Sequence, residues 1–301
     1  MSPKPHLFFT LMGSTVLSAC LQRPDNSSSS GTIRGIAERE VEALAAVRVL
    51  EEDLDAVRFA ADLFAPGMMV SGPHLFFGPE FPPCAEISVS GTSYPREVRV
   101  RYGDGCEDRL GRVRRGSLSL VLNDALERTG ARCEIQSENL SLGNHNFVLH
   151  ALVQNTGQDE EGRRTMWVRS ESILGTPGEQ DSLSIVRTCE EKKVWIRGFD
   201  TPDISDDRFL RSGKGFIRQG KVQYELETTK ELLVDGSCSY PLQGIIRLRS
   251  ETEEVIIDFG DGACDEQAIV VQSGNRHVLD LGSIPLVMNV RVGGKTPVLV
   301  E

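Results

Sequence analysis

One segment near the start of the chain has the hydrophobic spacing of an α-helix. Between residues 35 and 66, apolar side chains recur every third or fourth position with Glu, Asp and Arg between them, at Val41, Leu44, Val47, Leu50, Leu54, Val57, Ala61 and Phe64. This spacing places them on one face of an amphipathic helix, which Pro66 and Gly67 end. We expect the helix to pack on the protein's own sheet. A partner-binding coiled coil is the alternative, because the spacing is close to a heptad.

From residue 85 the hydrophobic period changes to two, the spacing of β-strands with one buried face. Apolar residues alternate with polar ones or flank a tryptophan at Val98 and Val100, Leu118 and Leu120, Met166 and Val168, Val194 and Ile196, and Tyr224 and Leu226. No strand–helix alternation follows, which disfavours a parallel α/β sheet. The pattern predicts a mostly β body over residues 67–301: antiparallel sheet or sheets of many strands, with the one N-terminal amphipathic helix packed on it.

Two similar sequences recur within this body, VRVRYGDGCED at 98–108 and IIDFGDGACDE at 256–266. Each closes a segment that begins with an earlier cysteine, 84–106 and 238–264. A hairpin folded at the midpoint of each segment brings its two ends side by side, at the separation that a disulfide requires. We therefore predict two related disulfide hairpins, which pair Cys84 with Cys106 and Cys238 with Cys264.

The Gly-Asp-Gly in each repeat has a structural explanation. A strand that turns or bulges to present its cysteine needs glycine at positive φ, and aspartate bonds nearby backbone N–H groups. The turn residues are Gly103, Asp104, Gly105, Gly260, Asp261 and Gly262.

A calcium loop is the alternative explanation of the second repeat, with Asp258, Asp261 and Asp265 as its weak candidate ligands. Calcium requires six to eight oxygen ligands. The first repeat has Arg101 in the place of Asp258 and so lacks one of them. We predict no metal site and no cofactor.

The N-terminus predicts export. Residues 7–19 form an apolar stretch too short to span a bilayer as a permanent helix. The sequence Leu-Ser-Ala-Cys at its end resembles the lipobox of bacterial lipoproteins, which implies a signal peptide over 1–19 and acylation of Cys20. An ordinary signal peptide that happens to contain a cysteine is the alternative. Residues 20–34 are the expected lipidated cysteine and flexible tether, and Leu21, instead of the aspartate that retains lipoproteins at the inner membrane, favours the outer membrane.

With Cys20 assigned to lipid, six of the seven cysteines remain, and an even number in an exported chain indicates disulfides. Cys133 and Cys189 are left after the two hairpin pairs, so we predict by elimination that they form a third disulfide. Two buried free thiols are the alternative.

Charge and motifs exclude several functions. The net charge of −11 repels nucleic acid, and the chain has no HExxH, GxSxG, P-loop or GxGxxG motif. His145 and His150 are five positions apart on a predicted strand, so they face opposite sides and cannot bind one ion. The acidic segment with Asp200, Asp203, Asp206 and Asp207 is expected to be a solvated turn, and cation binding is the alternative.

Residues 80–275 resemble uncharacterised envelope lipoproteins best represented in the Bacteroidota. The similarity rests on CSYPLQGIIRLRSETEEVIIDFGDGACDEQAIVVQSG at 238–274 and YGDGCEDRLGRVRRGSLSLVL at 102–122. It implies a lipid-anchored all-β body and no particular activity; the segment 281–301 has no counterpart in it. We expect a non-enzymatic protein of the bacterial envelope, held by membrane lipid through Cys20, that binds an unknown protein or glycan. An envelope glycan hydrolase and a structural spacer are the alternatives.

Overall fold

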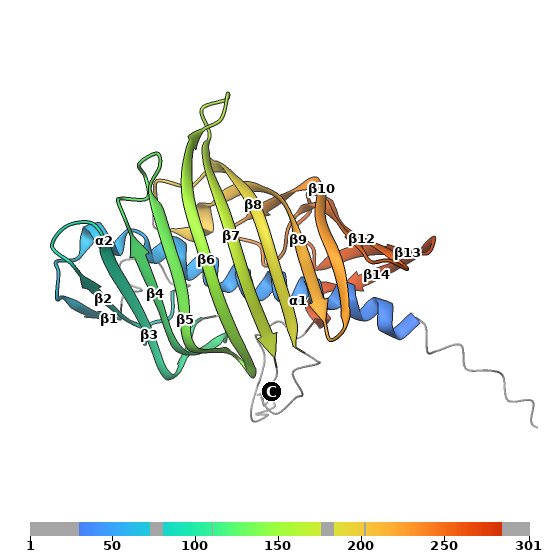
Figure 1. Ribbon diagram of the computed structural model, residues 1–301, viewed down its shortest axis with the longest axis horizontal. Helices are drawn as coiled ribbons and strands as arrows, with labels where there is room; N and C mark the ends of the chain where they lie inside the picture. Colours follow the sequence, from blue (N-terminus) through green and yellow to red (C-terminus); the bar gives the residue numbers. More distant parts are fainter. Residues whose placement is uncertain (1–29, 73–80, 110, 176–183, 202, 285–301) are drawn as a thin grey trace, which may run out of the picture.

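The computed structural model describes residues 30–72, 81–109, 111–175, 184–201 and 203–284. In these ranges fourteen strands form one sheet whose order follows the chain from β1 to β14, and every neighbouring pair is antiparallel (Figure 1). The prediction of a mostly β, antiparallel chain with one N-terminal helical segment is confirmed.

The strands of the first half are β1 (Met69–Ser71), β2 (Glu86–Ser90), β3 (Arg96–Glu107), β4 (Val113–Leu122), β5 (Arg132–Leu142), β6 (His145–Gln158) and β7 (Arg164–Gly175). Those of the second half are β8 (Ile185–Arg197), β9 (Arg208–Gln219), β10 (Val222–Asp235), β11 (Gln243–Arg249), β12 (Glu254–Asp261), β13 (Gln267–Gln272) and β14 (Asn275–Asp280). The short 3₁₀ helix η2 (Ile204–Asp206) lies between β8 and β9, and η3 (Leu281–Ser283) follows β14.

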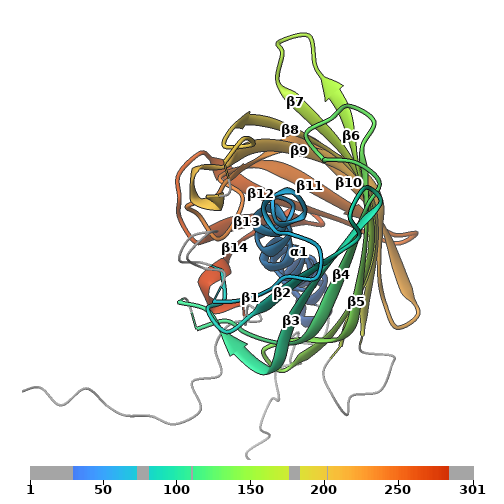
Figure 2. The same ribbon diagram turned by 90° about the vertical axis from the view of Figure 1, so that its left-hand side faces the viewer.

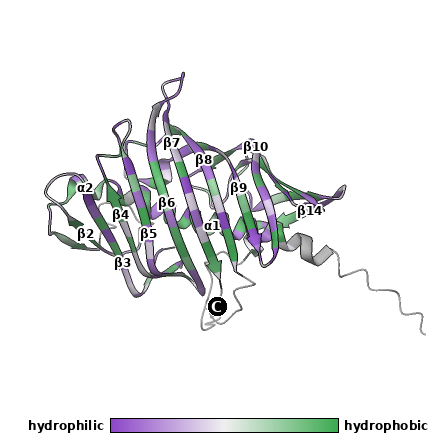
Figure 3. Cartoon of the chain, in the orientation of Figure 1, coloured by the Kyte–Doolittle hydropathy of each residue, from purple (hydrophilic) through white to green (hydrophobic). Residues whose placement is uncertain are grey.

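The sheet curls around the helix α1 (Ser30–Val57), which runs along the long axis of the molecule on the concave side (Figures 1 and 2). β-Sheets have an inherent twist, and a twisted sheet of long strands can curve around a helix, whose diameter is about 10 Å. Hydrophobic and hydrophilic residues alternate along the strands (Figure 3), which gives the sheet one inward and one outward face.

The predicted helix boundaries are wrong at both ends. α1 begins at Ser30, so residues 30–34 of the predicted tether are helical, and it ends at Val57, with a separate single turn, α2, over Ala60–Leu63. Between them, the guanidinium of Arg58 donates a hydrogen bond to the backbone carbonyl of Phe199, on the segment that follows β8. The interruption is therefore fixed by a contact with a distant segment, and no helix-breaking residue marks it in the sequence.

The polar face of α1 is buried. An amphipathic helix packed on one side of an open sheet would instead expose its polar face to water. The predicted apolar face is buried as expected, apart from the half-buried Leu54. Acidic residues of the other faces are buried as well, at Glu40, Glu42, Glu51, Glu52 and Asp53. The curled sheet surrounds the helix, so each of its faces meets inward side chains.

Both predicted hairpin disulfides are formed. Cys84 is bonded to Cys106 with a Cα–Cα distance of 5.5 Å, and Cys238 to Cys264 with 6.0 Å. The midpoint argument therefore identifies the correct partners in each repeat.

The third predicted disulfide is wrong, because Cys133 and Cys189 are buried free thiols. Cys133 is on β5 and Cys189 on β8, three strand positions apart in the sheet. At 4.7–4.9 Å per spacing this is roughly 14 Å, and a disulfide needs Cα atoms within about 7 Å. Pairing the two remaining cysteines by elimination takes no account of strand order, and strand order alone sets the distance between them.

The turn glycines have the predicted positive φ, at +62° for Gly103, +157° for Gly105, +92° for Gly260 and +116° for Gly262. The carboxylate of Asp258 accepts a hydrogen bond from the backbone N–H of Gly260 at 3.0 Å. The aspartate that bonds this glycine is therefore Asp258, two positions before it, and not the predicted turn residue Asp261.

Two further observations concern metals and membranes. Within the ranges that the structure describes, no group of three or more His, Cys, Asp or Glu side chains is arranged to hold a metal ion, and this includes Asp258, Asp261 and Asp265. No helix in those ranges is long and apolar enough to cross a membrane. The predicted signal peptide, Cys20 and the part of the predicted tether up to residue 29 lie outside the described residues, as does 285–301.

Candidate functional site

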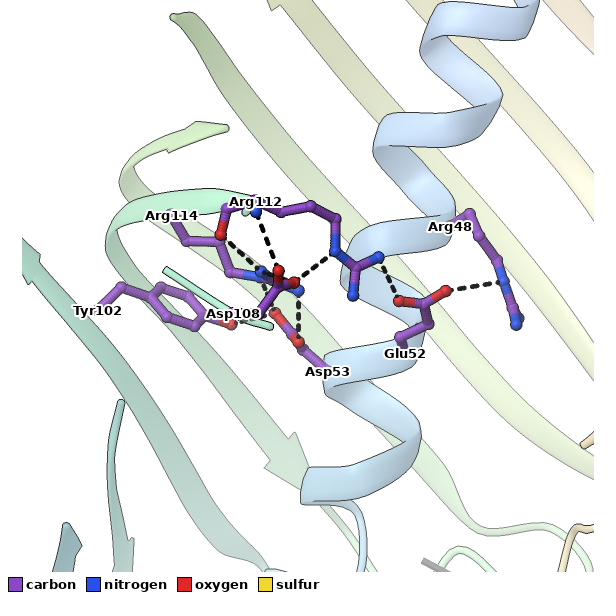
Figure 4. A network of polar contacts seen from close by, with 7 residues as sticks. All are labelled: Arg48, Glu52, Asp53, Tyr102, Asp108, Arg112 and Arg114. Atoms are coloured by element: carbon purple, nitrogen blue, oxygen red, sulfur yellow. Dashed lines mark hydrogen bonds and ion pairs between the residues drawn. The ribbon is translucent and has the colours of Figure 1, made fainter. Parts of the chain in front are cut away.

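A first buried network joins α1 to β4 (Figure 4). Arg114 donates hydrogen bonds to both carboxylate oxygens of Asp53, at 2.7 Å and 3.0 Å, and Tyr102 donates to the same carboxylate at 2.7 Å. Arg114 also bonds Asp108, at 2.9 Å. Arg112 extends the chain of contacts from Asp108 to the α1 carboxylate of Glu52, at 2.6 Å, and Arg48 lies 3.3 Å from the other oxygen of Glu52. The network contains three acidic and three basic side chains, so its formal charges cancel.

A second buried network joins α1 to β8 and β9. Glu40 pairs with Arg187 at 3.1 Å, and Arg187 with Glu191 at 3.2 Å. Arg211 links Glu191 to Glu51, whose carboxylate also binds Lys193 at 2.8 Å. Although burial opposes ionisation, the guanidiniums of Arg211 and Arg187 lower the pKa of Glu191. This network also balances three acids with three bases.

These networks fix the position and rotation of α1. Removing one member leaves a buried charge without its partner, which costs roughly 3–5 kcal/mol, whereas the complete pair adds little net stability over apolar packing. A helix held by bidentate ion pairs at defined positions has one register against the sheet. The networks are therefore structural.

A cavity of about 60 Å³ remains between α1 and strands β4 to β8. Its walls are mostly apolar, and they include Leu54, Cys133, Ala151, Val153 and Trp195. Leu54, Ala151 and Val153 are half-buried although they lie on the inner side, because this cavity exposes part of their surface. Burial raises the pKa of the Cys133 thiol to about 12, so the thiolate is not available near neutral pH.

Two carboxylates near this cavity, those of Asp55 and Asp207, lack the basic partners that neutralise the acidic side chains of the two networks. No basic group of the described chain lies within 4 Å of the Asp55 carboxylate, and one oxygen of Asp207 is buried without a hydrogen-bond partner there. Burial and the neighbouring charge of Asp55 raise the pKa of Asp207 to about 7. Asp207 is 2 % exposed, so our prediction of a solvated turn is wrong for this residue. Asp203 and Asp206 bond Ser205 and Thr201 in that turn.

The outer face of the sheet carries an open groove of about 900 Å³ across β5 to β10. This volume lies within the range of about 300–1,000 Å³ that is usual for ligand pockets. Outward side chains line it, and they are mainly charged, with Leu152 and Phe216 as the large apolar exceptions. Phe216 is 44 % exposed. Gly215 allows β9 to approach β8 closely here, because a Cβ atom at this position would lie 1.9 Å from the carbonyl oxygen of Thr188.

The groove is the strongest candidate for binding, and sequence reasoning did not find it. Its residues are isolated polar positions on six strands, and only their register brings them together. The available signal was Phe216, a large apolar residue in the outward phase of β9, next to inward Ile217.

The histidines and tryptophans lie as follows. His145 faces inward, 3.5 Å from Glu42, and His150 faces outward in the groove, so the prediction of opposite faces is confirmed. Trp195 is buried against Phe199 and Phe209, with ring centroids 5.3 Å and 5.1 Å away. Trp167 is half-buried on the outer face. Neither tryptophan lines the groove.

Comparisons of the chain with family models, with curated proteins and with solved structures find no match. The resemblance to envelope lipoproteins stays a prediction.

Proposed function

We propose that this chain is a non-enzymatic lipoprotein of the bacterial envelope that binds a partner in the groove across β5 to β10. The single observation that carries the proposal is this open groove of about 900 Å³, with an exposed aromatic side chain among charged ones. Exposed aromatic residues supply much of the binding energy at many interfaces. The interior offers a cavity of about 60 Å³, which is smaller than the 150 Å³ cavity that binds benzene in other proteins.

The proposed anchor is the acyl group on Cys20, with the following residues as a tether to the sheet. This part rests on the resemblance of Leu-Ser-Ala-Cys to a lipobox. Metabolic labelling with a palmitate analogue tests it: we expect the full chain to be labelled and Cys20→Ser to be unlabelled. Cys133→Ser is the matched control and keeps the label. Equal labelling of the wild type and Cys20→Ser would reject the anchor.

A glycan hydrolase is the less favoured function. A solvent-exposed cleft with two carboxylates and a tryptophan would favour it over a binding protein. The groove contains glutamates, but both tryptophans lie elsewhere. The observation that would favour hydrolysis is therefore missing from the described residues.

Site-specific photocrosslinking in intact cells tests binding. A photoreactive amino acid replaces Phe216 in the groove, and the matched control carries it at Ile196, which is 45 % exposed but outside the groove. We expect a discrete crosslinked species from position 216 alone. Crosslinking from neither position, or equally from both, would reject the groove as the binding site.

A further inference from the structure

Two rows of outward side chains cross the groove. In the first, directly opposed residues alternate in charge from β7 to β11: Arg169, Glu190, Lys214, Glu227 and Arg247. Arg169 lies 4.0 Å from Glu190, and Arg247 pairs with Glu227. This row, the neutralised row, sets three bases against two acids, so each glutamate faces a base and the row offers no net attraction to a cationic ligand.

The second row runs parallel to it, two residues further along each strand. From β6 to β10 its directly opposed members are His150, Glu171, Thr188, Phe216 and Glu225. Glu171 and Glu225 are exposed, and neither carboxylate has a basic group within 4 Å in the described part of the chain, although Arg249 of β11 is the directly opposed residue of Glu225. This row, the acidic row, thus has two free carboxylates on either side of an exposed phenylalanine.

The whole groove is acidic. Five glutamates line it, at positions 134, 171, 190, 225 and 227, against the two bases Arg169 and Lys214, which leaves a net charge of −3 with His150 neutral. The chain as a whole carries −11. Both the local and the total charge attract cations and repel anionic ligands.

The spacing of the acidic row suits an extended polypeptide. Glu171 and Glu225 are on β7 and β10, three strand spacings apart, which is about 14 Å. Side chains i and i+4 of an extended chain point to the same side and are also separated by about 14 Å. Residue i+2 then lies between the two carboxylates, within reach of Phe216.

We infer that the groove binds an extended cationic polypeptide segment, with lysine or arginine side chains on Glu171 and Glu225 and an apolar side chain on Phe216. The inference rests on the proposed function and adds the chemistry of the partner. Each exposed ion pair contributes modestly, so loss of both is expected to weaken binding roughly tenfold.

The test uses the full chain and a labelled peptide in which lysine–serine–phenylalanine–serine–lysine is repeated twice. Fluorescence anisotropy measures its binding to the wild type, to Glu171→Gln/Glu225→Gln, and to Glu160→Gln/Glu251→Gln. The last pair removes the same charge at exposed positions outside the groove. We expect binding to the wild type that weakens with salt, roughly tenfold weaker binding to the groove variant, and no change in the control variant.

Four outcomes would overturn the inference. Equal weakening in both variants would mean that net charge alone attracts the peptide. A peptide with glutamate in place of lysine that binds as well would remove the role of charge. Binding of neutral oligosaccharides that survives Glu171→Gln/Glu225→Gln would identify a glycan groove. A crosslinked partner at position 216 without lysine-peptide binding would overturn this inference and leave the proposed binding function standing.

Discussion

Arg114 of β4 donates hydrogen bonds to both carboxylate oxygens of Asp53 on α1, and neither side chain is more than 2 % exposed. The two residues are 61 positions apart in the chain. They connect the helix to a strand of the first half of the sheet, as Glu51 and Arg211 connect it to the second half. The helix is thereby a central part of the fold, because one element makes specific contacts with both halves.

Asp53→Ala is expected to lower the free energy of unfolding by about 3–5 kcal/mol, because it leaves the buried guanidinium of Arg114 without its main partner. Denaturant unfolding measures the change. The apolar double variant Asp53→Leu/Arg114→Met should recover much of the loss, since it removes both charges. Arg128→Ala is the control: its side chain is 69 % exposed in its pair with Asp124, and we expect less than about 1 kcal/mol. A similar loss in Asp53→Ala and Arg128→Ala would contradict a buried network.

Asp207 makes stability depend on pH. Its pKa is about 7 in the folded protein and about 3.9 unfolded, so the folded state holds this proton more tightly. The stabilisation is complete below about pH 4 and is lost as the pH rises to about 7. Relative to Asp207→Asn, which resembles the protonated form, the wild type should lose on the order of 1–4 kcal/mol between pH 4 and pH 8.

Unfolding curves of the wild type and Asp207→Asn at several pH values measure this difference. Asp200→Asn alters an exposed carboxylate of the same turn and should leave the pH dependence of the wild type unchanged. A constant difference between the wild type and Asp207→Asn over this range would show that Asp207 has no raised pKa.

The cysteines should divide into two chemical classes. Under native conditions iodoacetamide should leave Cys133 and Cys189 unmodified, because both thiols are buried and burial raises the pKa of Cys133 to about 12. Unfolding without reductant should expose these two thiols, and mass spectrometry should find both alkylated. Detection of a peptide that links Cys133 to Cys189 would restore the third disulfide.

The hairpin disulfides should stabilise the sheet. Replacing Cys238 and Cys264 by serine opens a loop with a sequence separation of 26 residues, and the chain-entropy model gives a loss of about 3.5 kcal/mol for such a loop. Thermal unfolding compares this variant with Cys133→Ser/Cys189→Ser, which breaks no covalent link. An equal loss of stability in the two variants would mean that the effect comes from altered packing and not from the broken disulfide.

Val153→Ile should fill part of the internal cavity. One added methylene in existing space contributes up to about 0.8 kcal/mol, so we expect a small rise in the free energy of unfolding. Val121→Ile adds the same group at an outward position that is 43 % exposed, and it should have little effect. A loss of more than about 1 kcal/mol in Val153→Ile would indicate overpacking and no free space.

The sequence by itself determined the features that depend on local pattern. The period-two alternation identifies strands, the helical spacing identifies α1, and the symmetry of each repeat pairs its cysteines, because hairpin partners are close in the chain. The predictions that were wrong concern features set by contacts between residues far apart in the chain. On β8 the inward residues include Arg187, Cys189, Glu191 and Lys193, while Ile196 is 45 % exposed, so apolar alternation indicates the wrong face there.

Only the tertiary structure decided the curvature of the sheet, the burial of all faces of α1, the separation of Cys133 from Cys189 and the groove. The physical reason is that a buried charge is tolerated only beside its partner, and such partners lie far apart in the chain, by 160 positions for Glu51 and Arg211. Strand order and register bring them together, as they bring Glu171 and Phe216 to one surface, and neither can be derived from local periodicity.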